Sequence, residues 1–133
     1  MAIEKKKQLR GDVLIADDDL SICEILKNYC EKMGCFRNIL MVHDGSMASS
    51  KLRNQKFGLI LIDLKMPKKS GLDLLRELDD KSLNTKNSVV VVSGTLDKTV
   101  VEKILATGVK SFLLKPFTEV EFTEKVIKSL GIK

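Results

Sequence analysis

The sequence predicts an α/β protein built on a doubly wound parallel sheet with helices on both faces. Short runs rich in Val, Ile and Leu alternate with longer stretches whose apolar residues recur every three or four positions. The short runs are almost continuously apolar, as expected of strands that are buried on both faces. Alternation of this kind is typical of a parallel sheet whose strands are joined by right-handed helical crossovers.

Five strands and five intervening helices are expected. The strands cover about 12–17, 37–42, 57–62, 89–93 and 111–114. Each helix has a start or stop signal: Gly34 ends the first, Asp44-Gly45 begins the second, Ser70-Gly71 begins the third, Gly108 ends the fourth, and Thr118 begins the last.

Length and composition predict one folded domain. The chain has 133 residues, of which 44% are hydrophobic and 31% charged, as in ordinary globular proteins. We expect a basic N-terminal tail over residues 1–10 and a domain over 11–133. Neither a signal peptide nor an apolar run of the roughly 20 residues that span a membrane is apparent, so we expect a cytoplasmic protein.

Charge and cysteine content add little about function. The net charge is +5, but the lysines are scattered and lack interleaved aromatic residues, so we expect a solvated surface rather than a nucleic-acid site. Cys23, Cys30 and Cys35 lack a paired metal-ligand spacing, and we interpret them as small core residues.

Polar residues capable of chemistry lie at the carboxyl ends of four of the predicted strands. Asp17 and Asp18 lie at the end of the first strand, Asp63 at the end of the third, Ser93 at the end of the fourth and Lys115 at the end of the fifth. The carboxyl ends of parallel strands meet at one edge of the sheet, where such folds bind ligands. We therefore expect these five side chains to line one crevice.

This set of groups suits phosphoryl chemistry. Three neighbouring carboxylates repel one another, and a hard divalent ion, Mg²⁺ or otherwise Mn²⁺ or Ca²⁺, would relieve the repulsion. Ser93 and Lys115 supply a hydroxyl donor and a cation for phosphoryl oxygens. Asp63 is the best candidate nucleophile, forming an aspartyl phosphate by positioning and charge neutralisation.

Several motifs resemble those of a response-regulator receiver domain, the CheY-like domain of two-component signalling, over nearly the whole chain. They are Ala16-Asp17-Asp18-Asp19, Asp63-Leu64-Lys65-Met66-Pro67, Ser70-Gly71, Ser93-Gly94, Phe112 and Lys115-Pro116-Phe117. The resemblance implies a flavodoxin-like sheet in the strand order 2-1-3-4-5.

The resemblance also implies a phosphorelay role. A histidine kinase or histidine phosphotransfer protein would donate a phosphoryl group to Asp63. Asp18, Asp63 and the backbone carbonyl of Lys65 would bind Mg²⁺ directly, and Asp17 would bind it through a water. Ser93 and Lys115 would contact the phosphoryl group, so the domain would catalyse only its own phosphorylation and dephosphorylation.

Switching is implied in the same way. Ser93 would move toward the phosphoryl group and Phe112 would rotate inward. This movement would repack the face formed by the fourth helix, the fifth strand and the fifth helix, where a downstream protein would bind. No binding of nucleic acid or membrane by the domain itself is expected.

Four residues depart from the family's commoner pattern or invite a second interpretation. Lys65 stands where a neutral or amide side chain is usual, and either alters dephosphorylation or is a solvated lysine. Ser93 replaces threonine and keeps the hydroxyl. Phe112 lacks the hydroxyl of tyrosine, so it gives a weaker or partner-specific output, or is simply core. His43 is interpreted as a turn residue rather than a phosphotransfer histidine.

Other classes of function fit less well. A haloacid-dehalogenase-type phosphatase wants a second acid where Lys65 stands, and a nucleotide- or flavin-binding protein wants a glycine-rich loop where Asp17-Asp18-Asp19 stand. The alternative that stays open is a phosphorylation-independent interaction module with a receiver fold. The stretch after Lys115 has room for one last helix and none for an effector. We therefore expect either a stand-alone regulator or a receiver domain cut from a longer protein.

Overall fold

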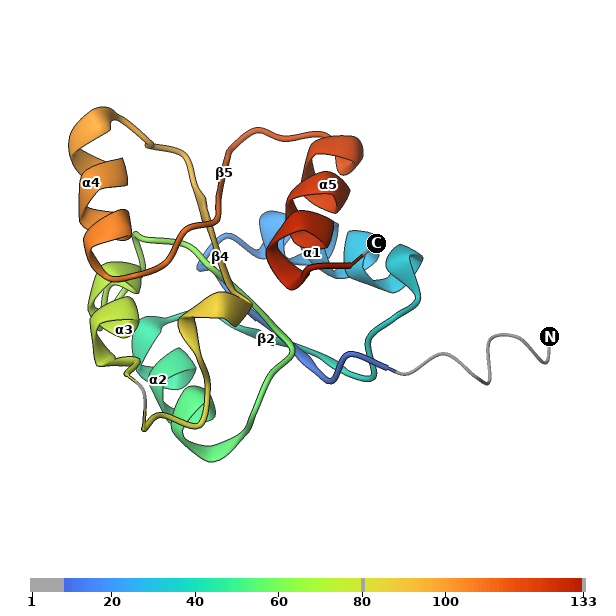
Figure 1. Cartoon of the computed structure of the whole chain (residues 1–133), viewed down its shortest axis with the longest axis horizontal. Helices are drawn as coiled ribbons and strands as arrows, with labels where there is room; N and C mark the ends of the chain where they lie inside the picture. Colours follow the sequence, from blue (N-terminus) through green and yellow to red (C-terminus); the bar gives the residue numbers. More distant parts are fainter. Residues whose placement is uncertain (1–8, 80, 133) are drawn as a thin grey trace, which may run out of the picture.

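A five-stranded parallel sheet forms the centre of the computed structural model, which describes residues 9–79 and 81–132 (Figure 1). The strands lie in the order β2-β1-β3-β4-β5, which confirms the predicted fold class and strand order. Their bounds are β1 (Val13–Ala16), β2 (Ile39–Val42), β3 (Leu59–Ile62), β4 (Val89–Ser93) and β5 (Phe112–Leu114).

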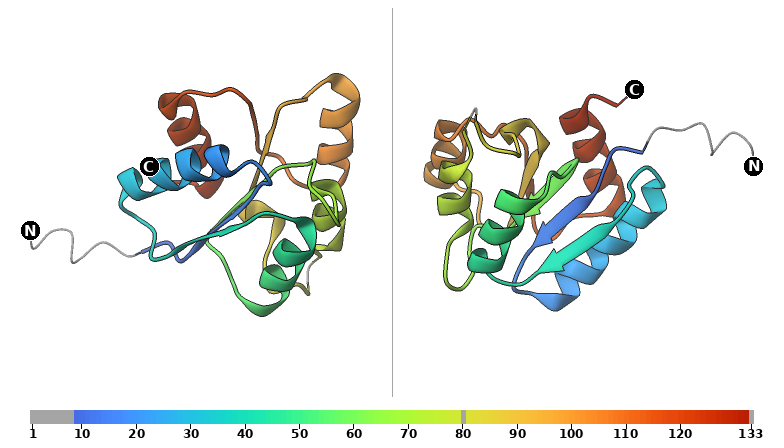
Figure 2. Two further views of the ribbon diagram at one scale, coloured as in Figure 1. Left: turned by 180° about the vertical axis from the view of Figure 1, so that it is seen from behind. Right: turned by 90° about the horizontal axis from the view of Figure 1, so that it is seen from below.

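Helices cover both faces of this sheet. They are α1 (Leu20–Met33), α2 (Gly45–Asn54), α3 (Gly71–Glu77), α4 (Lys98–Ala106) and α5 (Glu119–Leu130). Figure 2 shows α1 and α5 on one face and α2, α3 and α4 on the other, as expected for a doubly wound sheet.

Two apolar layers hold the helices on the sheet. On one face, residues such as Leu26 of α1 and Phe122 of α5 pack on β1, β3 and β4. On the other face, Leu52, Leu74 and Ile104 pack from α2, α3 and α4. Strands β1 and β3 are buried throughout, which explains why their sequences are continuously apolar.

The predicted helix signals act as expected at most ends. Gly34 ends α1 in the left-handed conformation, with φ +67°, which glycine adopts without steric cost. Ser70 and Thr118 cap α3 and α5, and Thr118 forms a full capping box with Glu121. Helix α4 ends at Ala106 with Thr107 as its cap, so Gly108 lies just beyond the helix rather than at its end.

Other expectations had mixed outcomes. Cys23 and Cys30 are buried in the core, but Cys35 is only partly buried, so its interpretation as a core residue was wrong. The predicted basic tail falls mostly on residues 1–8, outside the described residues. Among the helices described, none has the length and apolar character needed to cross a bilayer.

A short 3₁₀ helix, η2 (Lys86–Ser88), precedes β4 and was not predicted. Upstream of it, the buried amide of Asn84 accepts a hydrogen bond from the Phe57 N–H at 2.7 Å. The same amide donates to the carbonyls of Leu52 and Gln55, both at 2.8 Å. Asn84 thus ties the end of α2 and the start of β3 to this segment.

Candidate functional site: an acidic cluster with a lysine

The pairing of β1 with β3 brings two acids side by side. Ala16 and Ile62 are register partners, so Asp17 and Asp63 follow them at neighbouring strand ends. The Asp63 N–H donates to the Ala16 carbonyl at 2.9 Å, and the Asp17 N–H donates to the Val42 carbonyl of β2 at 3.1 Å. The backbone ladder therefore fixes both acids.

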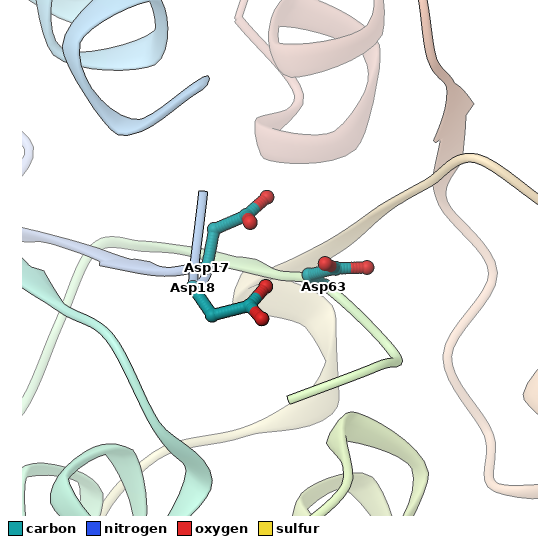
Figure 3. Close-up of side chains that lie close together, drawn as sticks. All are labelled: Asp17, Asp18 and Asp63. Atoms are coloured by element: carbon teal, nitrogen blue, oxygen red, sulfur yellow. The ribbon is translucent and has the colours of Figure 1, made fainter. Parts of the chain in front are cut away.

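Asp18 completes an acidic cluster. One oxygen from each carboxylate of Asp17, Asp18 and Asp63 lies within 4.8 Å of the other two, and Figure 3 shows the three side chains gathered at the adjoining strand ends. Asp17 and Asp63 are only 1% and 7% exposed, whereas Asp18 is exposed to solvent. The cluster is thus open on one side.

Lys115 neutralises part of this charge. Its Nζ donates to Asp17 Oδ2 at 2.8 Å and to Asp63 Oδ2 at 3.4 Å. The Lys115 N–H donates to the Ser93 carbonyl at 2.8 Å, which fixes the lysine at the end of β5. Four of the five predicted site residues therefore meet in one place, as the strand-end argument expected.

The electrostatics of the cluster follow from burial and proximity. Desolvation raises the pKa of Asp63, and the nearby charge of Asp17 raises it further, while Lys115 partly offsets both effects. Burial alone would lower the pKa of Lys115. Its hydrogen bond to Asp17 and the charge of Asp63 outweigh burial and raise that pKa, so the amine stays charged.

The cluster fits a hard divalent cation. Its ligand atoms are carboxylate oxygens, the donors that Mg²⁺ prefers, and the residues involved are Asp17, Asp18 and Asp63. Lys115 relieves only part of the repulsion between Asp17 and Asp63. Neutralising the rest would favour the binding of such a cation. Lys65 lies beside the cluster: its N–H donates to Asp63 Oδ1 at 3.4 Å, and its side chain is exposed.

Ser93 is the fifth predicted residue, and its hydroxyl is engaged elsewhere. It donates to the Thr95 carbonyl and accepts from the Thr95 N–H, both at 3.2 Å. Ser93 is buried at the end of β4, next to β3, but its described hydrogen bonds do not reach Asp63. Sequence reasoning placed the residue correctly and missed this partner.

The loop after Asp63 is fixed by close backbone packing. The Gly71 N–H donates to the Leu64 carbonyl at 2.8 Å, and the Gly45 N–H donates to the Pro67 carbonyl at 3.0 Å. A Cβ at Gly71 would lie only 2.2 Å from the Asp63 carbonyl oxygen. The Ser70-Gly71 pair thus has a physical role, since only glycine lets α3 begin so close to the site.

Three residues near the site had no predicted role in it. His43 Nδ1 lies 3.2 Å from the Asp17 carbonyl oxygen, and the Cys23 thiol lies 3.3 Å from the same oxygen. Asp19 caps α1 by accepting from the N–H of Ser21 at 3.0 Å. Together they hold the turn that carries Asp17 and Asp18. The position of His43 just after β2, the neighbour of β1, was the available signal.

A groove lies beside β5, away from the acids. It is a cavity of about 560 Å³ lined by Leu96, Phe112, Leu113, Leu114, Glu121, Glu124, Lys125 and Lys128. Phe112 is partly buried, and Lys125 Nζ lies 5.9 Å from the centroid of its ring. The predicted switch residue therefore borders this groove.

Sequence comparison supports one family. The model of the response regulator receiver domain matches residues 13–127. The transcriptional regulatory protein ZraR of Escherichia coli K12 is 31% identical over 79% of this chain and 23% of its own length. MalR of Bacillus subtilis is 34% identical over 80% of this chain and 44% of its own length. The chain thus spans less than half of these relatives.

Solved structures show the same fold. The chemotaxis protein CheY4 of Vibrio cholerae has a TM-score of 0.79 at 21% identity, covering 90% of this chain and 98% of that one. The receiver domain of the sensor histidine kinase PA1611 from Pseudomonas aeruginosa, solved with magnesium in its active-site cleft, has a TM-score of 0.77 at 20% identity, covering 90% and 97%. The family match over residues 13–127 shows that the chain belongs to the response-regulator receiver domains of two-component signalling.

Proposed function

We propose that this receiver domain accepts a phosphoryl group on Asp63 and signals through the α4-β5-α5 face. The observation that carries the proposal is the contact of Lys115 with both Asp17 and Asp63, at 2.8 and 3.4 Å, within an acidic cluster that is open to solvent at Asp18. The Lys115 ammonium group and the carboxylates of Asp17 and Asp18 thus surround the carboxylate of Asp63, which is largely buried. This arrangement suits attack on phosphorus.

The chemical step is a displacement at phosphorus. An oxygen of Asp63 attacks the phosphohistidine of a kinase or phosphotransfer protein. The new O–P bond forms as the N–P bond breaks, and the imidazole nitrogen leaves with the bonding electron pair. Lys115 already contacts Asp63, so its ammonium group is positioned to neutralise charge on the transferred phosphoryl oxygens.

Divalent metal is part of the proposal. Asp18 and Asp63 would hold Mg²⁺, or Mn²⁺, directly with the Lys65 carbonyl, and Asp17 would hold it through a water. When bound, the ion supplies positive charge that reduces repulsion between the carboxylates and an incoming phosphate. The domain of PA1611 carries magnesium in its cleft within the same fold, which supports this assignment by analogy.

The output would depend on Ser93 and Phe112. A phosphoryl group on Asp63 adds nearly two negative charges and new acceptor oxygens. Ser93 would exchange its present bonds to Thr95 for a bond to phosphate, which frees space beside β4. Phe112 would turn inward and change the 560 Å³ groove, which we propose as the binding surface of a downstream protein.

The phosphoryl donor and the cellular location are further parts of the proposal. We propose a histidine kinase or a histidine phosphotransfer protein as the donor and a cytoplasmic location for the domain. The sensor kinase/phosphatase LuxQ of Vibrio vulnificus is 28% identical over 92% of this chain, so similar domains also occur within kinases. The basic tail at 1–10 and the domain limits at 11–133 remain part of the proposal.

The test is intact-protein mass spectrometry after incubation with acetyl phosphate and Mg²⁺. We expect one added phosphoryl group, absent from Asp63→Asn and from a sample with chelator. Beryllofluoride should shift the amide resonances of 93–96 and 112–114 in the wild type only. If neither acetyl phosphate nor beryllofluoride changes the protein, the domain is a phosphorylation-independent interaction module instead.

A further inference from the structure

Four lysines gather at the edge of the sheet opposite the acidic cluster. Lys86 of η2, Lys110 before β5, and Lys125 and Lys128 of α5 line a cavity of about 260 Å³. Its other lining residues are Asn87, Ser111 and Ser129, and none of the residues that line it is acidic. We call this cavity the basic pocket.

The lysines of the basic pocket have no anionic partners within the described part of the chain. The ion pairs there involve other cations, among them Lys32, Lys69 and Lys115. Lys125 instead lies over the ring of Phe112. Like charges that share one cavity repel one another, and a bound anion would relieve that repulsion.

The 3₁₀ helix η2, helix α5 and the loop before β5 form the walls of the pocket. Helix α5 packs against η2, and the Ser111 carbonyl accepts from the Val91 N–H at 3.0 Å. Lys86 lies against Gly108, where a Cβ would be 3.0 Å from the lysine Cδ and 3.5 Å from its Nζ. The absence of a side chain at Gly108 therefore leaves the space that Lys86 occupies.

We propose that the basic pocket binds a compact phosphate anion, the diphosphate group of a small molecule or free pyrophosphate. Clustered ammonium groups select a multiply charged anion, and two hydroxyls and one amide add neutral donors to phosphoryl oxygens. This site is separate from Asp63, and the proposal does not depend on phosphorylation.

The surroundings favour a compact ligand over an extended polyanion. Lys125 and Lys128 also line the neighbouring groove, where Glu121 and Glu124 lie one turn earlier on α5. A nucleic-acid backbone, with a charge every few ångströms, would pass from the lysines to these carboxylates. A diphosphate is short enough to remain among the lysines.

The test is a titration of the full chain with pyrophosphate at constant ionic strength, monitored by ¹H–¹⁵N NMR. Chelator is present, so that no metal carries the ligand to the acidic cluster. We expect saturable one-to-one binding with shifts centred on residues 86–88, 109–111 and 125–129. Absence of saturable binding, or shifts centred on residue 63, would overturn the proposal.

Two double variants make the test specific. Lys86→Gln with Lys128→Gln removes two pocket charges, and we expect Kd to rise at least about tenfold, the size of one charge-assisted hydrogen bond. Lys51→Gln with Lys56→Gln makes the same charge change on exposed lysines at the α2 end and should leave Kd unchanged. Lys125 is left intact because it also contacts Phe112. Equal weakening in both double variants would contradict the proposal.

A comparison of ligands identifies the source of the phosphate. ADP binding tighter than pyrophosphate would indicate a nucleotide, and equal binding would indicate recognition of the diphosphate alone; either supports the proposal. Tighter binding of a short DNA duplex than of both, lost in the Lys86/Lys128 variant, would overturn it in favour of a nucleic-acid surface.

Discussion

At the scale of single residues, the charge balance of the site depends on Lys115. Among the described residues it is the cation that contacts both buried carboxylates, with 18% of its side chain exposed against 2% for Asp17 and 9% for Asp63. In the resting domain it takes over part of the role that a divalent ion would have. Asp63 is nevertheless left with a raised pKa, because burial and Asp17 act against its ionised form.

The raised pKa predicts that ionised Asp63 lowers the free energy of unfolding, by an amount that depends on pH. Its folded pKa lies above its unfolded value, so the folded state binds the proton more tightly and loses stability as pH rises from about 3.8 through the folded pKa. Asp63→Asn removes this loss. We expect the variant to be more stable than wild type at pH 7 without metal, with a much smaller difference near pH 3, where the Asp63 carboxyl is mostly protonated in both states.

Urea unfolding at several pH values in chelator checks this prediction. Asp18→Asn is the matched control, since it makes the same change at the exposed acid of the cluster and should have a smaller effect. A pH-independent difference between Asp63→Asn and wild type would contradict the assignment of the cost to ionised Asp63.

We expect Lys65 to slow the loss of phosphate from Asp63 compared with an asparagine at the same position. Its exposed side chain lies two residues after Asp63, a position suited to stabilising the proposed phosphoryl group or to hindering the attacking water. We expect Lys65→Asn to shorten the phosphate lifetime about two- to fivefold, as suits an exposed charge interaction. Lifetime is measured by phosphate release after removal of the donor.

Lys68→Asn is the control for Lys65. It removes the same charge from an exposed neighbour, and asparagine tolerates the positive φ of +71° at that position. Equal lifetimes in wild type and Lys65→Asn would mean that Lys65 is an ordinary solvated lysine.

At the scale of elements, the start of α3 determines how the loop after Asp63 packs. Gly71 begins the helix against the Asp63 carbonyl, and a Cβ there would overlap it at 2.2 Å. We expect Gly71→Ala to destabilise the domain by about 1–3 kcal/mol, the usual cost of overpacking, and to displace the loop that carries Lys65. Thermal unfolding and amide NMR shifts around residue 63 measure the two effects.

Gly94 offers a control for Gly71 close to the same site. Its Cβ would meet nothing within 4 Å, and its φ is not in the positive range. Gly94→Ala should therefore be nearly neutral in stability. If both variants lost the same stability, close packing at Gly71 would not be the cause.

The elements were the most predictable part of the fold. Strands buried on both faces have unambiguous apolar runs, and caps such as Thr118 are local in sequence. Asn84 was not predictable, because its three partners lie 27 to 32 residues away. The pairing of Ser93 with Thr95 was missed for another reason, since a hydroxyl at a strand end has several possible partners.

At the scale of the whole molecule, the site is predictable because the strand order determines which residues come together. The residues that directly follow β1, β3 and β5 meet only when the strands take the observed order, and each of these positions carries a polar residue in the sequence. The basic pocket was not predictable in this way. Its lysines come from η2, a loop and α5, and in sequence they look like scattered surface charge.

A divalent cation should stabilise the whole domain. A ligand that binds only the folded state raises the free energy of unfolding by about 2.7 kcal/mol at one hundred times its Kd. We expect Mg²⁺ to raise the melting temperature of wild type in proportion to this term. The effect should be lost when Asp18→Asn and Asp63→Asn are combined, and an equal shift in that double variant would place the ion elsewhere.

The register of β1 against β3 also gives the acidic cluster a use in folding studies. Side chains alternate between the two faces of a strand, so a slip of one residue in β3 would carry Asp63 away from Asp17 and Lys115. The cluster forms only when the two central strands are correctly aligned. A spectroscopic label that senses the Asp63–Lys115 contact would therefore time the alignment of these strands during refolding, separately from collapse of the apolar layers.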